Sequence, residues 1–177
     1  QARAARQVHV QAVRLDAVRG MRWDELEDLD GPAPIWRVPP ARMKLKKAKK
    51  AQERFAHLVP LSPAAVAVLR ECANLRNAAN SQVGQGGLVF PGRRKNSPLG
   101  EGAIGALYIR AGFGGRHVPH GWRSSFSTIL NELLGEGWSL TIDRALAHSP
   151  EDKVEAAYNR AELLERRREI FDRWGEL

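Results

Sequence analysis

The chain has 177 residues, 43% of them hydrophobic, which suits one domain with a core of its own. Lysine and arginine total 28 against 20 acidic residues, so the formal net charge is +8 and the pI is about 10.2. Such a chain attracts polyanions, DNA and RNA above all, although a basic protein without a nucleic-acid partner has the same composition. The sequence has no apolar run long enough to cross a bilayer.

The first predicted element is a helix. Apolar residues from Val8 to Met21 recur at helical spacing, and the pattern closes near Gly20 and Trp23. Two extended segments follow, residues 35–38 and 56–62, on either side of the basic stretch RMKLKKAKKAQER. Two short strands joined by one loop predict an antiparallel hairpin.

Helices dominate the rest of the chain. SPAAVAVLRECANL predicts a helix with Ser62 as N-cap and Pro63 at its first position. Residues 81–98 are predicted to be loop, and residues 99–113 a short helix that ends at Gly112. Further helical patterns cover residues 121–134, 139–148 and 154–174. The predicted fold class is α+β, mostly helical, with a small antiparallel sheet in a single domain.

Six polar residues form a candidate catalytic set. They are Arg14 and Lys44 in the first half and His120, Arg123, His148 and Tyr158 in the second. Arginine binds phosphate oxygens in a bidentate way, and a tyrosine hydroxyl can attack phosphorus. A lysine or histidine can protonate the leaving oxygen. The sequence shows no cluster with metal-ligand spacing, so cationic side chains would have to stabilise the transition state.

The segments AVRLDAVRGMRWDELE, HGWRSSFSTILNE and LAHSPEDKVEAAYNRAELLERRREIFDRW resemble the catalytic domain of tyrosine recombinases. The resemblance is greatest to integrases of prophages and genomic islands, and it covers almost the whole chain. It implies the DNA breaking-rejoining fold of that family. It also implies site-specific DNA recombination and integration through a 3′-phosphotyrosyl intermediate, with no cofactor, metal or ATP.

The resemblance assigns roles to individual residues. Tyr158 is expected to be the nucleophile, and Arg14 and Arg123 are expected to clamp the scissile phosphate. Lys44 is the expected general acid for the 5′-hydroxyl leaving group, with Lys46 and Lys47 as alternatives. His120 is expected to assist proton transfer at the tyrosine, and His148 to donate a hydrogen bond to the phosphate. The basic residues expected to bind DNA are Arg42, Lys46, Lys47, Lys49 and Lys50.

Two segments depart from the family pattern. The hairpin loop is longer and more basic than usual, and the residues after the first arginine differ. Relatives usually follow the first arginine with Pro-Gly and an acidic residue that supports it, whereas this chain has Leu15, Asp16 and Ala17. We expect Asp16 to replace that acidic residue from one position earlier. Three other histidines, His9, His57 and His117, lie outside the pattern and are interpreted as surface or packing residues.

The expected partner is double-stranded DNA at attachment sites. Residues 1–177 are predicted to be one catalytic domain, with the arm-binding and core-binding domains of such integrases outside this chain. The resemblance implies a homotetramer on synapsed DNA, a monomer for the isolated domain and a directionality factor as a further partner. The lone Cys72 favours a reducing, intracellular setting, which for this family is the bacterial cytoplasm and its nucleoid.

Two points stay open. The apolar residues Ile170, Phe171 and Trp174 can pack on a neighbouring protomer, or they can fold back onto their own core. The chemistry of a type IB topoisomerase is the same, and a degenerate recombinase fold that binds DNA without cutting it is a second alternative.

Overall fold

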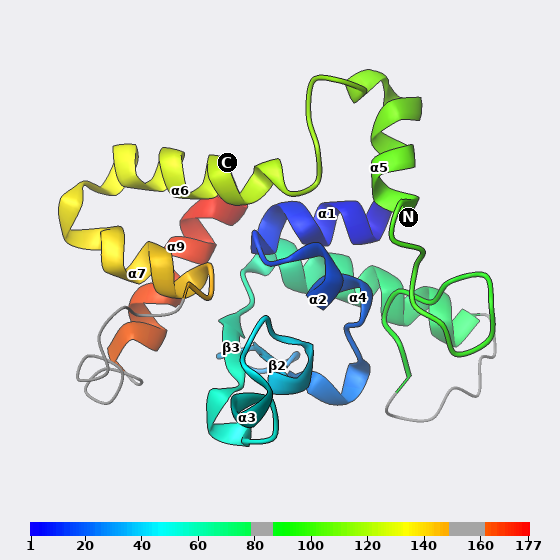
Figure 1. Cartoon of the computed structure of the whole chain (residues 1–177), viewed down its shortest axis with the longest axis horizontal. Helices are drawn as coiled ribbons and strands as arrows, with labels where there is room; N and C mark the ends of the chain where they lie inside the picture. Colours follow the sequence, from blue (N-terminus) through cyan, green and yellow to red (C-terminus); the bar gives the residue numbers. More distant parts are fainter. Residues whose placement is uncertain (79–86, 149–161) are drawn as a thin grey trace.

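Long helices and a small sheet make up the computed structural model, which describes residues 1–78, 87–148 and 162–177 (Figure 1). The helices are α1 (Ala2–Gln11), α2 (Leu15–Arg19), α3 (Lys47–Lys50), α4 (Pro63–Ala78), α5 (Ala103–Tyr108), α6 (Gly121–Leu134), α7 (Ser139–Ala145) and α9 (Glu162–Glu176). The strands are β1 (Leu26–Glu27), β2 (Ile35–Val38) and β3 (His57–Pro60). The predicted α+β class with a small antiparallel sheet is confirmed.

The sheet is antiparallel throughout, in the order β1-β2-β3. Trp36 pairs with Val59, and Val38 pairs with His57, which confirms the predicted hairpin. On β2 the side chains alternate, because Trp36 and Val38 are fully buried while Arg37 is exposed. β1 has only two residues, too few for a strand pattern in the sequence.

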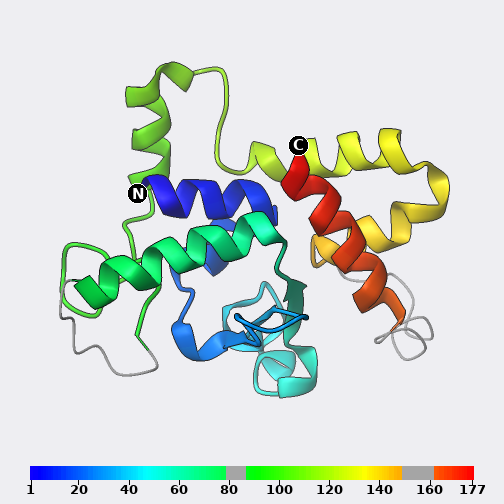
Figure 2. The same cartoon turned by 180° about the vertical axis from the view of Figure 1, so that it is seen from behind.

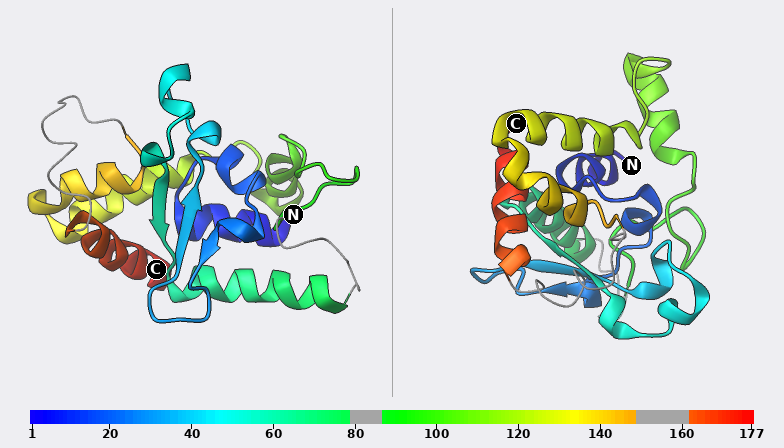
Figure 3. Two further views of the ribbon diagram at one scale, coloured as in Figure 1. Left: turned by 90° about the horizontal axis from the view of Figure 1, so that it is seen from below. Right: turned by 60° about the vertical axis from the view of Figure 1, so that its left-hand side comes forward.

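The hairpin loop, residues 39–56, carries the short helix α3 and extends beyond the sheet (Figure 3). Its five lysines are all exposed: Lys44, Lys46, Lys47, Lys49 and Lys50. The loop therefore presents its positive charge to solvent.

The predicted first helix is in fact two helices, so that prediction is wrong. Ala12 has a left-handed backbone (φ 46°, ψ 19°) that ends α1, and the extended Arg14 (φ −62°, ψ 136°) is the N-cap of α2. The break frees the Ala12 carbonyl, which accepts a hydrogen bond from the Arg123 guanidinium at 3.0 Å. A tertiary contact thus coincides with a break in a sequence pattern that is helical throughout.

The core lies where α1, α4, α6, α7 and α9 meet. α1 and α4 run side by side, and α9 lies beside one end of this pair and contacts both helices as well as β3 (Figure 2). Ser62 caps α4 as predicted, since its hydroxyl oxygen accepts the Ala65 N–H at 3.3 Å. No described helix combines the length and the apolar character that a membrane span requires.

The apolar residues of α9 pack within the chain, which decides the alternative left open by the sequence. Ile170, Phe171 and Trp174 are at most 3% exposed. The Phe126 ring lies 5.4 Å from Phe171 and 5.3 Å from Trp174, and the Trp174 indole donates to the His9 carbonyl at 2.7 Å. In the isolated chain these residues therefore belong to the chain's own core.

Two arginines of α9 form hydrogen bonds with the backbone of the hairpin. Arg167 donates to the Leu58 carbonyl on β3 at 2.8 Å, and Arg168 donates to the Pro34 carbonyl before β2 at 3.3 Å. α9 thus packs on both the helical core and the base of the hairpin.

Candidate active site

Arg123 is the centre of the candidate site. It lies on the first turn of α6, and only 6% of the residue is exposed. Its guanidinium donates to the Ala12 carbonyl at 3.0 Å and to the Leu146 carbonyl at 2.6 Å. One side chain thus joins the break between α1 and α2 to the end of α7. Burial, and then the charge of Arg14, lower the pKa of Arg123 to about 10, so the group stays cationic at neutral pH.

Arg14 and Arg123 line the same small cavity. The remaining lining comes from α2, the hairpin and the end of α7: Val13, Ala17, Val38, Arg42, Met43, His57, Leu146 and Ala147. Among the described residues, neither Arg14 nor Arg123 forms an ion pair with a carboxylate. Two neighbouring cations that no described carboxylate neutralises favour the binding of an anion, and guanidinium groups match the geometry of phosphate.

His148 contacts Arg123 and follows directly after Ala147, the last residue that lines this cavity. Its Nε2 lies 3.3 Å from a terminal nitrogen of Arg123, and its Nδ1 lies 3.1 Å from the carboxylate oxygen of Asp143. A guanidinium can only donate, so Nε2 accepts and Nδ1 carries the proton that is donated to Asp143. The expected donation from His148 to a phosphate would require a proton on Nε2, which this arrangement does not place there.

His120 precedes Arg123 by one helical turn. It is exposed and occupies the N-cap of α6, where its side chain makes no capping hydrogen bond. Its backbone carbonyl accepts the Arg123 N–H at 3.1 Å. The imidazole is thus unused by the helix and open to solvent, and its assistance in proton transfer stays a prediction.

The lysines of the hairpin loop do not line the cavity. Lys44 is exposed, and the Nζ of Lys49 lies 5.2 Å from the centre of the Phe55 ring. The structure therefore does not select the general acid among Lys44, Lys46 and Lys47.

Arg42 points inward, unlike the loop lysines. It pairs with the Glu25 carboxylate and donates to the Ala17 carbonyl at 3.1 Å. Glu25 is only 8% exposed, and it also accepts hydrogen bonds from the Trp36 indole and the Arg22 backbone, both at 3.1 Å. Arg42 thus anchors the start of the loop, and its expected contact with DNA stays a prediction.

Asp16 does not take the supporting place expected for it. Its side chain is 75% exposed and pairs with Arg19 at 2.8 Å, one turn further along α2. Arg14 lies before the helix as its N-cap, so a helical carboxylate paired at i,i+3 is not directed at it. The buried carboxylate of this region is Glu25, which comes from a different segment.

His57 packs between β3 and the end of α7, in line with its predicted role as a surface or packing residue, and it also lines the cavity. Its Nε2 lies 3.2 Å from the Ala145 carbonyl and donates to it. Burial, and then the charges of Arg167 and Arg123, lower the pKa of His57 to about 3. The ring is therefore neutral at physiological pH, and it joins β3 to the segment that carries His148. Only its place at the start of a predicted strand hints at this role.

Tyr158, the expected nucleophile, lies outside the described residues. The chain has two tyrosines, and the other, Tyr108, accepts a hydrogen bond from the Trp122 indole at 2.8 Å. Its hydroxyl is thus hydrogen-bonded within an aromatic cluster. The centre of the Tyr108 ring lies 5.8 Å from the centre of the His117 ring. Tyr108 does not line the arginine cavity.

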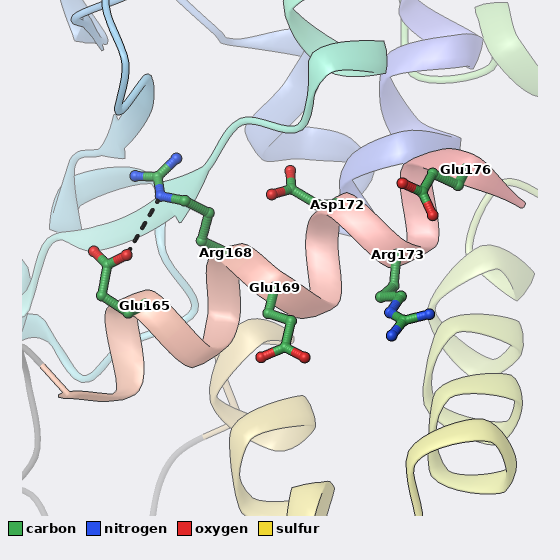
Figure 4. A pocket seen from close by; sticks show the side chains of 6 residues that line it. All are labelled: Glu165, Arg168, Glu169, Asp172, Arg173 and Glu176. Carbon is green, nitrogen blue, oxygen red and sulfur yellow. Dashed lines mark ion pairs between the residues drawn. The ribbon is translucent and has the colours of Figure 1, made fainter.

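A separate hollow runs along α9, away from the arginine cavity. Figure 4 shows the six side chains that line it: Glu165, Arg168, Glu169, Asp172, Arg173 and Glu176. All come from one face of one helix, and Glu165 pairs with Arg168 at 3.9 Å. No group of three or more histidine, cysteine, aspartate and glutamate side chains within residues 1–78, 87–148 and 162–177 is arranged to hold a metal ion.

Comparison with known proteins identifies the family of the chain. The model of the phage integrase family matches residues 6–163. The chain belongs to the phage integrase family. The chain is 39% identical over 158 residues to prophage integrase IntA of Escherichia coli K12. The aligned region covers 88% of this chain and 33% of IntA.

Two further relatives cover most of the integrase-family chain. Prophage integrase IntZ of the same strain is 31% identical over 177 residues, covering 98% of this chain and 38% of IntZ. The integrase of Shigella phage Sf6 is 29% identical over 167 residues, covering 93% of this chain and 38% of that protein. The chain thus spans little more than a third of the length of these relatives. No solved structure matches it significantly.

Proposed function

We propose that this chain is the catalytic part of a site-specific DNA recombinase that cuts and rejoins strands through Tyr158. The observation that carries the proposal is the pair Arg14 and Arg123, which share a cavity without a carboxylate partner among the described residues. His148 completes the pair through its contact with Arg123 at 3.3 Å. A scissile phosphate supplies the anion that this cavity lacks.

The proposed step is a transesterification at phosphorus. The Tyr158 oxygen attacks the phosphate held by Arg14 and Arg123, a bond from that oxygen to phosphorus forms, and the bond to the 5′ oxygen breaks. Lys44 gives its proton to the departing 5′ oxygen, and His120 accepts the proton of the tyrosine. The phosphodiester energy is kept in the tyrosyl ester, so religation needs neither ATP nor a metal ion.

The proposed partner is double-stranded DNA at attachment sites. The exposed hairpin lysines supply charge for the backbone, and the protein acts on nucleoid DNA in the bacterial cytoplasm. A homotetramer on synapsed sites and a directionality factor also belong to the proposal, whereas the isolated chain is a monomer. The tetramer must use surfaces other than Ile170, Phe171 and Trp174, because these are buried within the chain.

The test uses a pool of nicked duplexes with random sequence around the nick, so that a cleaved fragment diffuses away and traps the adduct. The 177-residue chain, incubated with EDTA and without nucleotide, should give a covalent protein–DNA band in a denaturing gel. Binding without any adduct would favour the degenerate alternative. Relaxation of supercoiled plasmid without strand exchange between two sites would favour the topoisomerase alternative.

A further inference from the structure

We propose that Asp143 is a positioning residue of this site, which fixes the tautomer and the ring orientation of His148 so that Nε2 faces Arg123. The inference rests on the proposed function and adds a residue that the family resemblance did not assign. It concerns three side chains from three places in the sequence: Asp143 on α7, His148 after α7, and Arg123 on α6.

Asp143 holds His148 in two ways. Its carboxylate accepts the Nδ1 proton at 3.1 Å, and its backbone carbonyl accepts the His148 N–H at 3.0 Å. Between them the chain turns back through Ala147, whose φ of 54° is left-handed. The turn brings the ring over the last turn of α7, where the carboxylate meets it.

The chemical consequence lies at the other nitrogen. A carboxylate beside Nδ1 keeps the proton there and leaves a lone pair on Nε2. Arg123 has donors only, so this tautomer attracts its guanidinium, whereas a proton on Nε2 would repel it. With two backbone carbonyls and His148 accepting from it, the plane of the Arg123 guanidinium is fixed before any phosphate arrives.

Asp143 and His148 are too exposed for their contact to contribute much to the stability of the fold. The side chains of Asp143 and His148 are 59% and 50% exposed, and a pair this open adds little to stability. Loss of the Asp143 carboxylate should therefore slow the reaction and leave the fold intact.

The kinetic test is a double-mutant cycle on covalent adduct formation with the nicked duplexes at saturating DNA. Asp143→Leu should slow the wild-type reaction about 10- to 100-fold, by analogy with the loss seen when the hydrogen-bond partner of a metal-ligating histidine is removed. Asp143→Glu, which keeps a carboxylate, should restore most of the rate. In a His148→Ala background Asp143→Leu should have less than about a twofold effect, since the residue acts through the histidine. DNA affinity and melting temperature should stay unchanged in all variants.

A second measurement does not depend on cleavage. Nitrogen chemical shifts of His148 in the 15N-labelled chain should show the proton on Nδ1 in the wild type and on Nε2, or on both in exchange, in Asp143→Leu. The inference is wrong if the wild type carries its proton on Nε2. It is also wrong if Asp143→Leu slows adduct formation by the same factor in the His148→Ala background as in the wild type. A wild-type chain that forms no adduct would instead count against the proposed function and leave the nitrogen shifts to decide the inference.

Discussion

Arg123 is a buried cation whose hydrogen-bond partners are two carbonyls and a histidine. Burial disfavours its charged form, and Arg14 adds a second positive charge beside it. The hydrogen bonds hold Arg123 in place, and neither arginine has a counterion among the described residues. At the scale of single residues, the site is therefore suited to bind an anion, because no described carboxylate of the chain pairs with Arg14 or Arg123.

Phosphate should stabilise the protein through this pair. At constant ionic strength, replacing chloride by phosphate should raise the melting temperature of the wild type, because an anion that binds only the folded state stabilises it. Arg14→Met should lose most of that rise, since Arg14 is only partly buried and can be removed without unfolding the chain. The control is Arg93→Met, a change at an exposed arginine away from the cavity. An equal rise in both variants would mean that phosphate binds elsewhere.

His57 should make stability depend on acidity. Its pKa falls from 6.5 to about 3 on folding, so the folded chain binds fewer protons than the unfolded chain between these values. Stability is thus complete above pH 6.5 and is lost as the pH falls towards 3, by at most about 5 kcal/mol. His57→Gln keeps a donor for the Ala145 carbonyl but cannot titrate. Urea unfolding from pH 7 to pH 4 should give this variant the smaller loss, whereas the exposed control His120→Gln should follow the wild type.

At the scale of elements, α9 belongs to the domain's own core. Truncation after Arg168 removes Ile170, Phe171 and Trp174, each of which is buried. Losing even one large buried side chain costs about 3–5 kcal/mol, so losing all three should exceed the stability of a typical domain. The truncated chain should be unfolded by circular dichroism at 25 °C, while a chain that lacks only Leu177, which is 67% exposed, should melt like the wild type. A folded truncated chain would show that α9 is an appendage.

The sequence predicts the elements whose signals are local. The hairpin strands and the Ser62 cap of α4 follow from propensity and spacing. The helix predicted over residues 99–113 is shorter in the structure, because α5 covers only Ala103–Tyr108, and Gly112 after it has a positive φ of 82°. The break at Ala12 is different, because the carbonyl that it exposes is hydrogen-bonded to the Arg123 guanidinium, more than half the chain away. No window of sequence around residue 12 contains that information.

The site residues also fall into those that the sequence predicts and those that only the structure reveals. Motif order brings Arg14, Arg123 and His148 together in advance, and the structure places the three in contact or in one cavity. His57 and Asp143 escape notice because their importance depends on what they touch: the Ala145 carbonyl for one and the His148 ring for the other. The Arg42–Glu25 pair likewise joins segments that no spacing rule connects.

At the scale of the whole molecule, the net charge of +8 is spread unevenly. The hairpin loop presents exposed lysines, whereas the hollow along α9 is lined by four carboxylates and two arginines. DNA should therefore approach the hairpin side and avoid the outer face of α9.

Salt dependence tests that orientation. Changing Lys46, Lys47, Lys49 and Lys50 to glutamine should flatten the plot of log affinity for duplex DNA against log salt, by up to about 0.9 for each phosphate contact removed. The control Arg173→Gln changes a cation on the outer face of α9 and should leave the slope as in the wild type. An unchanged slope in the lysine variant would mean that the hairpin loop does not touch DNA.

The most direct test of the proposed function is to locate the residue that is bonded to DNA. The adduct formed on nicked duplexes is digested with nuclease and protease, and the peptide that carries the remaining nucleotide is sequenced by tandem mass spectrometry. We predict that the nucleotide lies on Tyr158 and that Tyr158→Phe gives no adduct while its DNA affinity stays near that of the wild type. An adduct on Tyr108, or any adduct that persists in Tyr158→Phe, would contradict the proposed mechanism.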